Sequence, residues 1–455
     1  MKKLLYISYF FPPVGGSGVQ RSLKFTKNLP LSGWQPIVLM ADHRYLKQPK
    51  DYSLCDDEAR NTIVYNSFSP DLRWIFKVLW GLHLHSIVNF ITRKLILPDP
   101  ELLWLPFAKK TIKQIFKQHT IDLVLITAPP YSPLFLGQYI KKHYHVPYVV
   151  DFRDMWTMGV GRLDAPLSKR ISANEKSWEK KVITQAKAVV VVNQFMANKL
   201  SHSYPELAAS TFTAITNGYD EDDFTDIMAS LKDSYEQELP TLSNTAKQGL
   251  TRDESSVPSL CKPMHLVFTG SFYDRFQPDI LWEALHQLVT ENKIKQDSLM
   301  IDIYGKNNPH FVLGKFVNNP IINTMVQIHG YLPHHESIAK ICAADALLLF
   351  SPPGPGADMD SHSKLFEYLR SGVPILALVA IPSAGADILK KCHCSFIANS
   401  ASIAAIKFVI AELLQQWQTG KLALETDWAY VSSFERRALT AKLARVLDSA
   451  IEKLK

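Results

Sequence analysis

The residues with the most chemical potential lie between positions 361 and 378, which read SHSKLFEYLRSGVPILAL. The polar cluster at 361–363 predicts the start of a short helix over residues 364–370, because a serine at a helix start accepts hydrogen bonds from unpaired backbone N–H groups. Gly372 stands where a left-handed residue ends many helices, and the apolar run after it predicts a strand.

The N-terminus of this expected helix is suited to anion binding. Its unpaired N–H groups carry a partial positive charge, which makes it a ready phosphate site. Glu367 lies one turn further in, where its carboxylate could accept hydrogen bonds from a sugar hydroxyl attached to that phosphate. The segment could therefore hold a nucleoside diphosphate by backbone amides and its ribose by Glu367. The alternative is an ordinary capped helix with a solvated glutamate.

Composition indicates a globular protein of two or three domains, since the chain has 455 residues, of which 47% are hydrophobic and 20% charged. The odd number of five cysteines argues against a disulfide framework, and the Cys392-His393-Cys394 run has no second Cys/His pair with finger-like spacing, so we expect no metal. The N-terminal MKKLLYISYFFPP reads as a strand rather than a signal peptide. A cytoplasmic protein is therefore expected.

Charge is divided unevenly along the chain. Residues 1–215 carry 28 Lys and Arg against 15 Asp and Glu, whereas residues 216–455 carry 22 against 28. The basic first half predicts an anionic partner. Residues 74–97 combine aromatic and basic side chains, which suits either a helix lying at the cytoplasmic face of a membrane or a buried helical hairpin. No RNA-binding signature or zinc-finger spacing is present, so nucleic acid is not expected.

Short Val, Ile and Leu runs alternate with amphipathic stretches, which predicts an α/β fold with a doubly wound parallel sheet in each half of the chain. Residues 230–263 are polar and contain three prolines, and are expected to form a linker or insertion. The expected strands cover residues 4–8, 37–40, 123–127, 148–151 and 189–192 in the first half, and 266–269, 300–304, 326–329, 347–350 and 375–379 in the second.

Polar and glycine residues follow several of these strands, at the sheet edge where ligands of open parallel sheets bind. Gly15 and Gly16 follow the first strand, and Asp151, Arg153 and Asp154 end a later one. Their alternative roles are a plain turn and a structural salt bridge. In the second half the residues at strand ends are Gly270 with Arg275 soon after, Gly305 with Lys306, and Gly330 with Tyr331.

Five segments in order along the chain resemble those of bacterial GT-B glycosyltransferases of group 1, the family 4 type. They are ISYFFPPVGGSGVQR, VPYVVDFRDMWT, ITNGYDEDDF, VFTGSFYD and SKLFEYLRSGVPILAL. The terminal SSFERRALTAKLARVLD is similar to the closing helix of that family. The resemblance implies two Rossmann-like domains facing across a cleft. They would be an acceptor-side domain at 1–229, a linker at 230–263, a donor-nucleotide domain at 264–430 and a helix at 431–455 that returns to the first domain.

The resemblance also implies roles for individual residues. Glu367 would hold the ribose hydroxyls of the donor, and the amides of Ser363, Lys364 and Leu365 would meet its diphosphate. The glycines at 15 and 16 would approach the donor phosphate or the acceptor. The remaining implied contacts are Gly330 and Tyr331 with the base, Arg275 with the leaving diphosphate, and Asp151, Arg153 and Asp154 with the donor sugar.

One position departs from the family pattern. The first glutamate of its Glu-x7-Glu motif should stand at 359, where this chain has Met359 between Asp358 and Asp360. Either aspartate could contact the transferred sugar instead, or that contact is absent. The Asp-Met-Asp sequence also resembles a metal-binding Asp-x-Asp pair, but it stands in a Pro/Gly-rich loop rather than after a strand.

The expected function is transfer of a hexosyl-type sugar from a nucleoside diphosphate sugar to a saccharide or lipid-linked saccharide acceptor, with retention and without metal or other cofactor. Cell-surface polysaccharide or lipopolysaccharide assembly is the expected setting. The alternatives are a sugar-nucleotide epimerase of the same fold and a catalytically silent protein that binds sugar nucleotides. The donor base and sugar, the acceptor, the linkage and the oligomeric state do not follow from the sequence.

Overall fold

The computed structural model describes residues 1–46, 48, 50–55, 62–70, 78–84, 96–159, 167–225, 227, 262–272, 277–422 and 424–452. Arg275 and most of the segments 74–97 and 230–263 lie outside the described residues. The chain divides into two compact units. The first unit comprises Met1–Asn217 and Arg436–Lys455, and the second unit comprises Gly218–Glu435.

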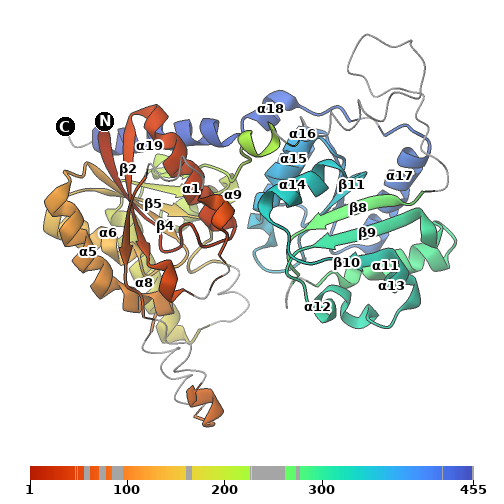
Figure 1. Cartoon of the computed structure of the whole chain (residues 1–455), viewed down its shortest axis with the longest axis horizontal. Coiled ribbons are helices and arrows are strands. Elements are labelled where there is room, and N and C mark those ends of the chain that lie inside the picture. The colour runs from red at the N-terminus through yellow and green to blue at the C-terminus, as the bar shows by residue number, and fades with distance from the viewer. Residues whose placement is uncertain are drawn as a thin grey trace. The chain divides into compact units, whose positions relative to one another are not determined.

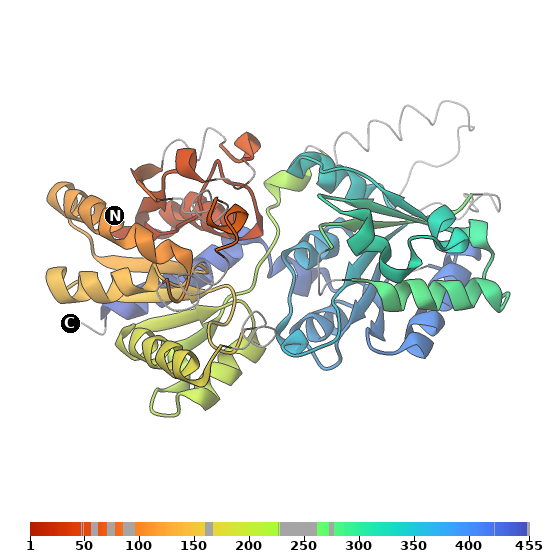
Figure 2. The same cartoon turned by 90° about the horizontal axis from the view of Figure 1, so that it is seen from below.

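Seven parallel strands form the sheet of the first unit, in the order β3-β2-β1-β4-β5-β6-β7 (Figures 1 and 2). All six residues of β4, which read LVLITA, are buried, as expected of a strand covered by helices on both faces. The strands are β1 Lys2–Ile7, β2 Trp34–Ala41, β3 Ile63–Ser67, β4 Leu123–Ala128, β5 Tyr148–Phe152, β6 Ala188–Val191 and β7 Phe212–Ala214.

The strand order reverses beside β1, so right-handed crossovers place α1 on one face of the sheet and α5, α6 and α8 on the other. α5 and α6 lie side by side (Figures 1 and 2), with the rings of Phe116 and Tyr144 stacked at 4.0 Å. The long helices of this unit are α1 Ser17–Asn28, α5 Leu105–Gln118, α6 Leu134–Tyr144, α8 Lys169–Gln185, α9 Gln194–Ser203 and α19 Arg436–Glu452.

The sheet of the second unit repeats this topology with six parallel strands, in the order β10-β9-β8-β11-β12-β13 (Figure 1). The order reverses between β8 and β11, and such a switch point is where ligands of doubly wound sheets bind. The strands are β8 Met264–Thr269, β9 Leu299–Tyr304, β10 Val326–Ile328, β11 Ala346–Phe350, β12 Ile375–Val379 and β13 Ser395–Asn399.

Two apolar clusters cover the two faces of this second sheet. One contains side chains of α11, α13 and α17, and the other contains side chains of α14, α15, α16 and α18. The helices are α11 Asp279–Thr290, α12 Pro309–Leu313, α13 Pro320–Met325, α14 His334–Cys342, α15 Ser363–Ser371, α16 Ala384–Cys392, α17 Ile403–Gln418 and α18 Trp428–Ser432. No helix in the described part of the chain is both long and apolar enough to span a bilayer.

The α/β class and the two doubly wound sheets are confirmed, and each of the ten predicted strands coincides with an observed one. The sequence analysis missed β3, β7 and β13. β3 and β13 are edge strands in which one residue of five is buried, and β7 is an edge strand of only three residues. Because these strands are covered incompletely or are very short, they lack the continuous apolar run that marks a central parallel strand.

The unit boundaries lie at 217/218 and 435/436, rather than at the expected 229 and 430. The segment after Asn217 belongs to the second unit because Tyr219 N–H donates to the carbonyl oxygen of Phe434 at 3.2 Å, and Phe224 is buried in the same cluster as Phe434. α19 belongs to the first unit, where Asp448 accepts hydrogen bonds from Trp34 Nε1 at 3.0 Å and Lys2 Nζ at 2.7 Å.

Candidate functional site

The helix α15 occupies the predicted place, after the loop that follows the β11 switch strand, and Gly372 ends it with a φ of 71°. The N-cap residue is His362, whose side chain makes no capping hydrogen bond, so the capping role expected of a serine is wrong. Leu365 N–H donates to the carbonyl oxygen of His362 at 3.1 Å. Of the three amides expected to meet a diphosphate, that of Leu365 therefore already has an acceptor in the protein. The N–H groups of Ser363 and Lys364 lie in the first turn of the helix, where the helix itself offers no acceptor.

Lys364 places a cation at the carboxyl end of β8. Its Nζ lies 3.6 Å from the centre of the Phe268 ring, and a Cβ atom added to Gly270 would lie 2.8 Å from that nitrogen. Burial lowers the pKa of Lys364 to about 7, and the nearby Glu367 carboxylate opposes this shift. The ammonium group is therefore held in a site that penalises its charge, and an anion bound beside it would stabilise that charge.

Gly270 and Gly305 let the loops after β8 and β9 pack closely at the same edge of the sheet. Their φ angles are 141° and 147°, and a Cβ on Gly305 would meet the Gly270 carbonyl oxygen at 2.0 Å. Asn307 joins the loops, since its Nδ2 donates to that oxygen at 2.9 Å and its Oδ1 accepts from Phe272 N–H at 2.8 Å. Because the glycines lack side chains, a phosphate bound beside Lys364 could approach the backbone of these loops closely.

The other residues predicted at these strand ends are more open. Gly305 N–H donates to the carbonyl oxygen of Gly330 at 3.0 Å, and a Cβ on Gly330 would meet no atom within 4 Å. Tyr331 is 62% exposed and Lys306 is exposed. These three residues lie at the correct sheet edge, but their geometry supplies no sign of a built pocket for a base.

Glu367 is half-buried and has a defined partner. Its Oε1 lies 3.1 Å from Nε2 of His334, the first residue of α14, and Nδ1 of the same ring lies 3.9 Å from Oδ2 of Asp223. The imidazole therefore sits between two carboxylates and orients that of Glu367. Lys364 lies three positions earlier, on the same side of α15. The second unit thus brings the cation and the carboxylate together near the N-terminus of α15.

Position 359, which departs from the family motif, is buried. Met359 is only 7% exposed, so its side chain faces the protein interior. Asp360 accepts a hydrogen bond from Ser351 Oγ at 2.7 Å, and both Asp358 and Asp360 are partly exposed. Among the described residues, no group of three or more His, Cys, Asp or Glu side chains is placed to hold a metal ion.

The glycine loop of the first unit also opens a helix. Gly16 has a φ of 125° and is the N-cap of α1, with no side-chain cap of its own. Arg153 lies against this helix start, because a Cβ added to Gly18 would lie 1.8 Å from Arg153 Nη1. Burial lowers the pKa of Arg153, and its guanidinium donates to the carbonyl oxygens of Ala128 and Pro129. Gly15, Gly16 and Arg153 are thus together at the carboxyl edge of the first sheet.

Asp151 does not belong with these residues. Its side chain is 1% exposed and forms a salt bridge with the fully buried Arg21 at 2.8 Å, while Thr127 Oγ1 donates to it at 3.0 Å. The expectation that Asp151 reaches a donor sugar is corrected by this geometry: its oxygens are committed inside the first unit. Asp154 is exposed three residues later, and Arg275 lies outside the described residues.

Residues 56–223 match the model of the family named Glycosyltransferase Family 4. A comparison with curated proteins finds no matching sequence. Solved structures match over the whole chain. A glycosyltransferase from Rickettsia africae ESF-5 has 13% identity and a TM-score of 0.60, with 100% of this chain and 99% of that one covered. These likenesses establish a GT-B fold, and residues 56–223 are similar to Glycosyltransferase Family 4.

Two further GT-B structures are similar. WaaG, described as a glycosyltransferase involved in lipopolysaccharide biosynthesis, has 12% identity and a TM-score of 0.59, with 97% of this chain and 99% of that chain covered. An α,α-trehalose-phosphate synthase (UDP-forming) from Burkholderia vietnamiensis has 10% identity and a TM-score of 0.62, with both chains covered fully. At these identities the likeness establishes the GT-B fold.

Three residues of this GT-B site were missed by the sequence analysis. His334 and Asn307 reach the site from α14 and the β9 loop, and Phe268 lies under Lys364 from within β8. His334 directly follows Pro333, in a sequence that carries no signal of its contact with Glu367, 33 positions away. Asn307 was the detectable one, because it lies two positions after the strand-end Gly305, at the sheet edge where ligands are expected.

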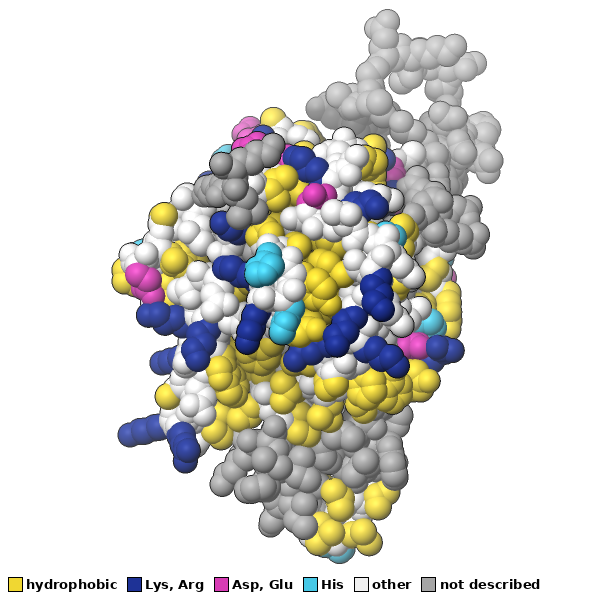
Figure 3. Space-filling view, turned by 90° about the vertical axis from the view of Figure 1, so that its left-hand side faces the viewer, with side chains coloured by type: hydrophobic (Ala, Val, Ile, Leu, Met, Phe, Trp, Pro, Cys, Tyr) yellow, Lys and Arg dark blue, Asp and Glu magenta, His cyan; other side chains and the backbone are white. Residues whose placement is uncertain are grey.

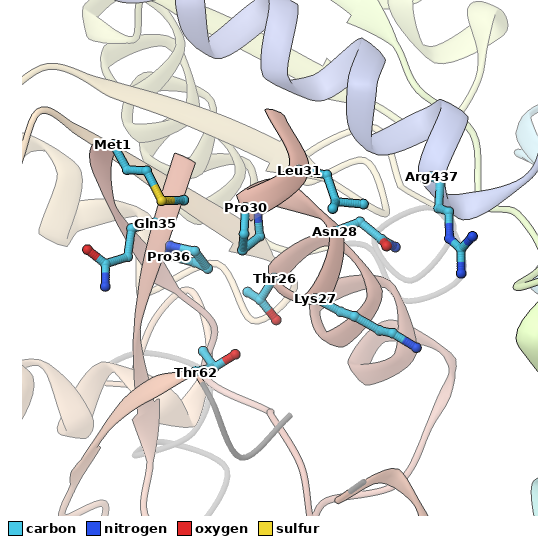
Figure 4. Close-up of a pocket in the computed structure, with 10 residues that line it drawn as sticks. All are labelled: Met1, Thr26, Lys27, Asn28, Pro30, Leu31, Gln35, Pro36, Thr62 and Arg437. Atoms are coloured by element: carbon cyan, nitrogen blue, oxygen red, sulfur yellow. The ribbon is translucent and has the colours of Figure 1, made fainter. Parts of the chain in front are cut away.

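A cavity of about 610 Å³ lies in the first unit but not at the predicted edge of its sheet (Figure 4). Met1, Gln35 and Pro36 line it from the amino ends of β1 and β2, and Lys27 and Arg437 line it from α1 and α19 (Figure 4). The ligand-binding edge of a doubly wound sheet is the carboxyl one. This cavity is therefore separate from the glycine loop and from the candidate donor site.

Proposed function

We propose that this chain transfers a hexosyl-type sugar from a nucleoside diphosphate sugar to a saccharide or lipid-linked saccharide acceptor, with retention of configuration and without a metal ion. The arrangement of Lys364 and Glu367 on α15 carries this proposal. It combines a partly desolvated cation, helix amides and a carboxylate at the β8/β11 switch point. A nucleoside diphosphate presents the matching groups, a pyrophosphate and a ribose diol.

Transfer requires charge to separate at the glycosyl–diphosphate bond. Positive charge develops on the sugar while negative charge develops on the departing diphosphate. Lys364 and the N-terminus of α15 would stabilise that negative charge without reorganisation during the reaction. Asp358 or Asp360 would lie toward the transferred sugar, in place of the glutamate that the family motif has at 359. Removing one such contact typically costs about 3 kcal/mol of barrier.

The acceptor is assigned to the first unit, where Gly15 and Gly16 stand at the carboxyl edge of the sheet, at the start of α1. Resemblance to the family supports this assignment. The involvement of WaaG in lipopolysaccharide biosynthesis supports cell-surface polysaccharide or lipopolysaccharide assembly as the setting. Arg153 and Asp154, which the resemblance assigns to the donor sugar, are charged, and Asp154 is exposed at the same edge.

A donor screen tests the proposal directly. The thermal unfolding of the chain is measured with UDP-, GDP-, ADP- and dTDP-sugars, each at a concentration near 100 times a plausible dissociation constant. The correct donor should stabilise the second unit by about 2.7 kcal/mol, a Tm increase of roughly 5–10 °C. If no sugar nucleotide raises the Tm, the assignment of α15 as the donor site fails.

Product analysis separates the transferase from its alternatives. Incubated with its donor, an acceptor and a chelator such as EDTA, the chain should release nucleoside diphosphate and form a glycosylated acceptor. An epimerase would convert the donor with no acceptor present, and a silent binding protein would bind the donor without product. Loss of transfer in EDTA, restored by a divalent ion, would contradict metal independence.

Donor binding should weaken as the pH rises through neutrality. The pKa of Lys364 is lowered to about 7, and a diphosphate bound beside it favours the protonated ammonium. The affinity for the donor should therefore be constant below pH 7 and fall above it by at most tenfold per pH unit. The fall should stop at the pKa that Lys364 has in the donor complex. The diphosphate of a sugar nucleotide is esterified at both ends and has no proton to lose near neutral pH. The pH dependence of the affinity therefore comes from the protein.

Isothermal titration with the sugar nucleotide from pH 6 to 9 measures this effect. Lys364→Met, which keeps most of the side-chain length without the charge, should bind the donor weakly, and its affinity should not change with pH over the same range. An equally steep profile in Lys364→Met would assign the titration to another group.

A further inference from the structure

One face of the first unit is strongly cationic. Residues 105–145, which include α5 and α6, contain six lysines and three histidines, no arginine and a single acidic residue, Asp122. Figure 3 views this side of the first unit, where Lys and Arg side chains (dark blue) and His (cyan) greatly outnumber Asp and Glu (magenta) and surround hydrophobic side chains (yellow). Asp122 accepts a hydrogen bond from Lys3 N–H at 2.7 Å, so it lies at the edge of the sheet rather than among the lysines.

The lysines of α5 project from its outer side. Lys110, Lys113 and Lys117 are all exposed, and their spacing of three and four positions places them on one face of the helix. Lys142 is exposed on the neighbouring α6. On the side of α5 that faces α6, the side chain of Lys109 packs against the ring of Tyr139, with Nζ 5.0 Å from the ring centre. The four exposed lysines therefore belong to one continuous surface, the α5–α6 face.

An exposed aromatic cluster adjoins this face at the start of α5. Phe107 occupies the same side of α5 as Lys110 and is 38% exposed. Its ring packs edge-to-face against Phe68 at 4.8 Å, and Phe68 packs in the same way against Tyr45 at 4.7 Å. Phe68 and Tyr45 are 41% and 44% exposed. Three aromatic rings thus remain in contact with solvent although they contact one another, at one end of the lysine row.

We propose that the α5–α6 face and the Phe107–Phe68–Tyr45 cluster dock the first unit onto an anionic lipid bilayer. Lysines attract anionic headgroups, each contributing roughly a fivefold factor to binding when it lies near the surface. Aromatic side chains favour the boundary between headgroups and acyl chains. From Phe107 to Lys117 the helix advances about 15 Å, so a single flat surface can meet the whole row.

The composition of the face favours lipid over nucleic acid. Residues 105–145 carry lysines and no arginine, and the arginine beside the aromatic cluster, Arg44 over the Tyr45 ring, is paired with Asp42. Lysines act as compact point charges, whereas recognition of nucleic-acid phosphates commonly draws on the planar fork of arginine. The aromatic rings pack edge against face with each other. Binding of single strands instead needs rings that offer their flat sides to successive bases. The docking surface is separate from Lys364 and Glu367, so it goes beyond sugar transfer.

Vesicle flotation with the full chain tests this inference. Vesicles of phosphatidylcholine with 30% phosphatidylglycerol should bind the chain, and phosphatidylcholine alone should bind it far more weakly. The triple variant Lys110→Ser/Lys113→Ser/Lys117→Ser should lose about 100-fold in partition coefficient, since three lysines are removed. Phe107→Ala should lose roughly tenfold on the same vesicles. Salt at 1 M should reduce binding of the wild type, because it shortens the screening length to about 3 Å.

A matched triple in the second unit controls for net charge. Lys293→Ser/Lys295→Ser/Lys421→Ser removes the same charge from exposed positions and should bind vesicles as the wild type does. Equal losses in the two triples, or no binding of the wild type to anionic vesicles, would overturn the proposal. So would a single-stranded oligonucleotide that binds more tightly than the vesicles and depends on the α5 lysines. Sugar transfer to a soluble acceptor should be unaffected by the α5 triple.

Discussion

Replacing Glu367 with alanine should lower kcat/KM for sugar transfer by about 10²–10⁴-fold while leaving the protein folded. Hydrogen bonds from neutral hydroxyls to a charged acceptor contribute about 1.5–3 kcal/mol each, and the ribose diol offers two. In the protein without donor, Glu367 Oε1 lies within hydrogen-bond distance of His334 Nε2, at 3.1 Å. Loss of that partly exposed contact should change the free energy of unfolding by about 1 kcal/mol or less.

Two companion variants show how the effect arises. Glu367→Gln keeps an acceptor oxygen without the charge and should fall between the wild type and Glu367→Ala. His334→Gln leaves the carboxylate in place but removes the imidazole that orients it, so it should raise KM for the donor several-fold with a smaller change in kcat. Wild-type transfer rates in Glu367→Ala, with donor and acceptor both identified, would remove this residue from the site.

The architecture was largely predictable because central strands of parallel sheets are covered on both faces. Strands such as β4 and β12 therefore appear as uninterrupted apolar runs, which alternate with amphipathic helices. β13, which reads SFIAN, is mostly half-buried and carries polar ends, so no such run marks it. The unit boundary moved from 229 to 217 because Phe224 packs into the second unit, and composition cannot reveal which core accepts a given aromatic residue.

The candidate site was predictable only where the signal is local. The position of α15 and its end at Gly372 follow from neighbouring residues, as does the place of Glu367 one turn inside the helix. The partner of Glu367 comes from 33 positions away and was not detectable. Asp151 illustrates the opposite failure. A carboxylate at a strand end has the same local pattern whether it meets a ligand or a buried arginine, and Arg21 stands 130 positions away.

The buried Arg21–Asp151 pair supports the largest expected effect on stability. Arg21 Nε and Nη2 both donate to the Asp151 carboxylate, at 3.2 and 2.8 Å, and the two side chains are 0% and 1% exposed. The same guanidinium donates to the carbonyl oxygens of Ile215 at 2.9 Å and Thr216 at 2.7 Å. The pair therefore ties α1 and β5 to the last residues of the first unit before the chain enters the second.

Arg21→Met should destabilise the first unit by about 3–5 kcal/mol, because it leaves the Asp151 carboxylate buried without its cation and two carbonyl oxygens without their donor. For a unit of this size the calorimetric Tm should fall by roughly 6–20 °C. Asp154→Asn, three residues along and exposed, should change the free energy of unfolding by only about 0.5 kcal/mol. In Arg21→Met/Asp151→Leu neither charge of the pair remains, so the double variant should be more stable than Arg21→Met alone, and the cycle of four proteins measures the coupling. A Tm for Arg21→Met equal to that of Asp154→Asn would show that the pair contributes little to the stability of the first unit. Asp151 would then be open again to a role in binding.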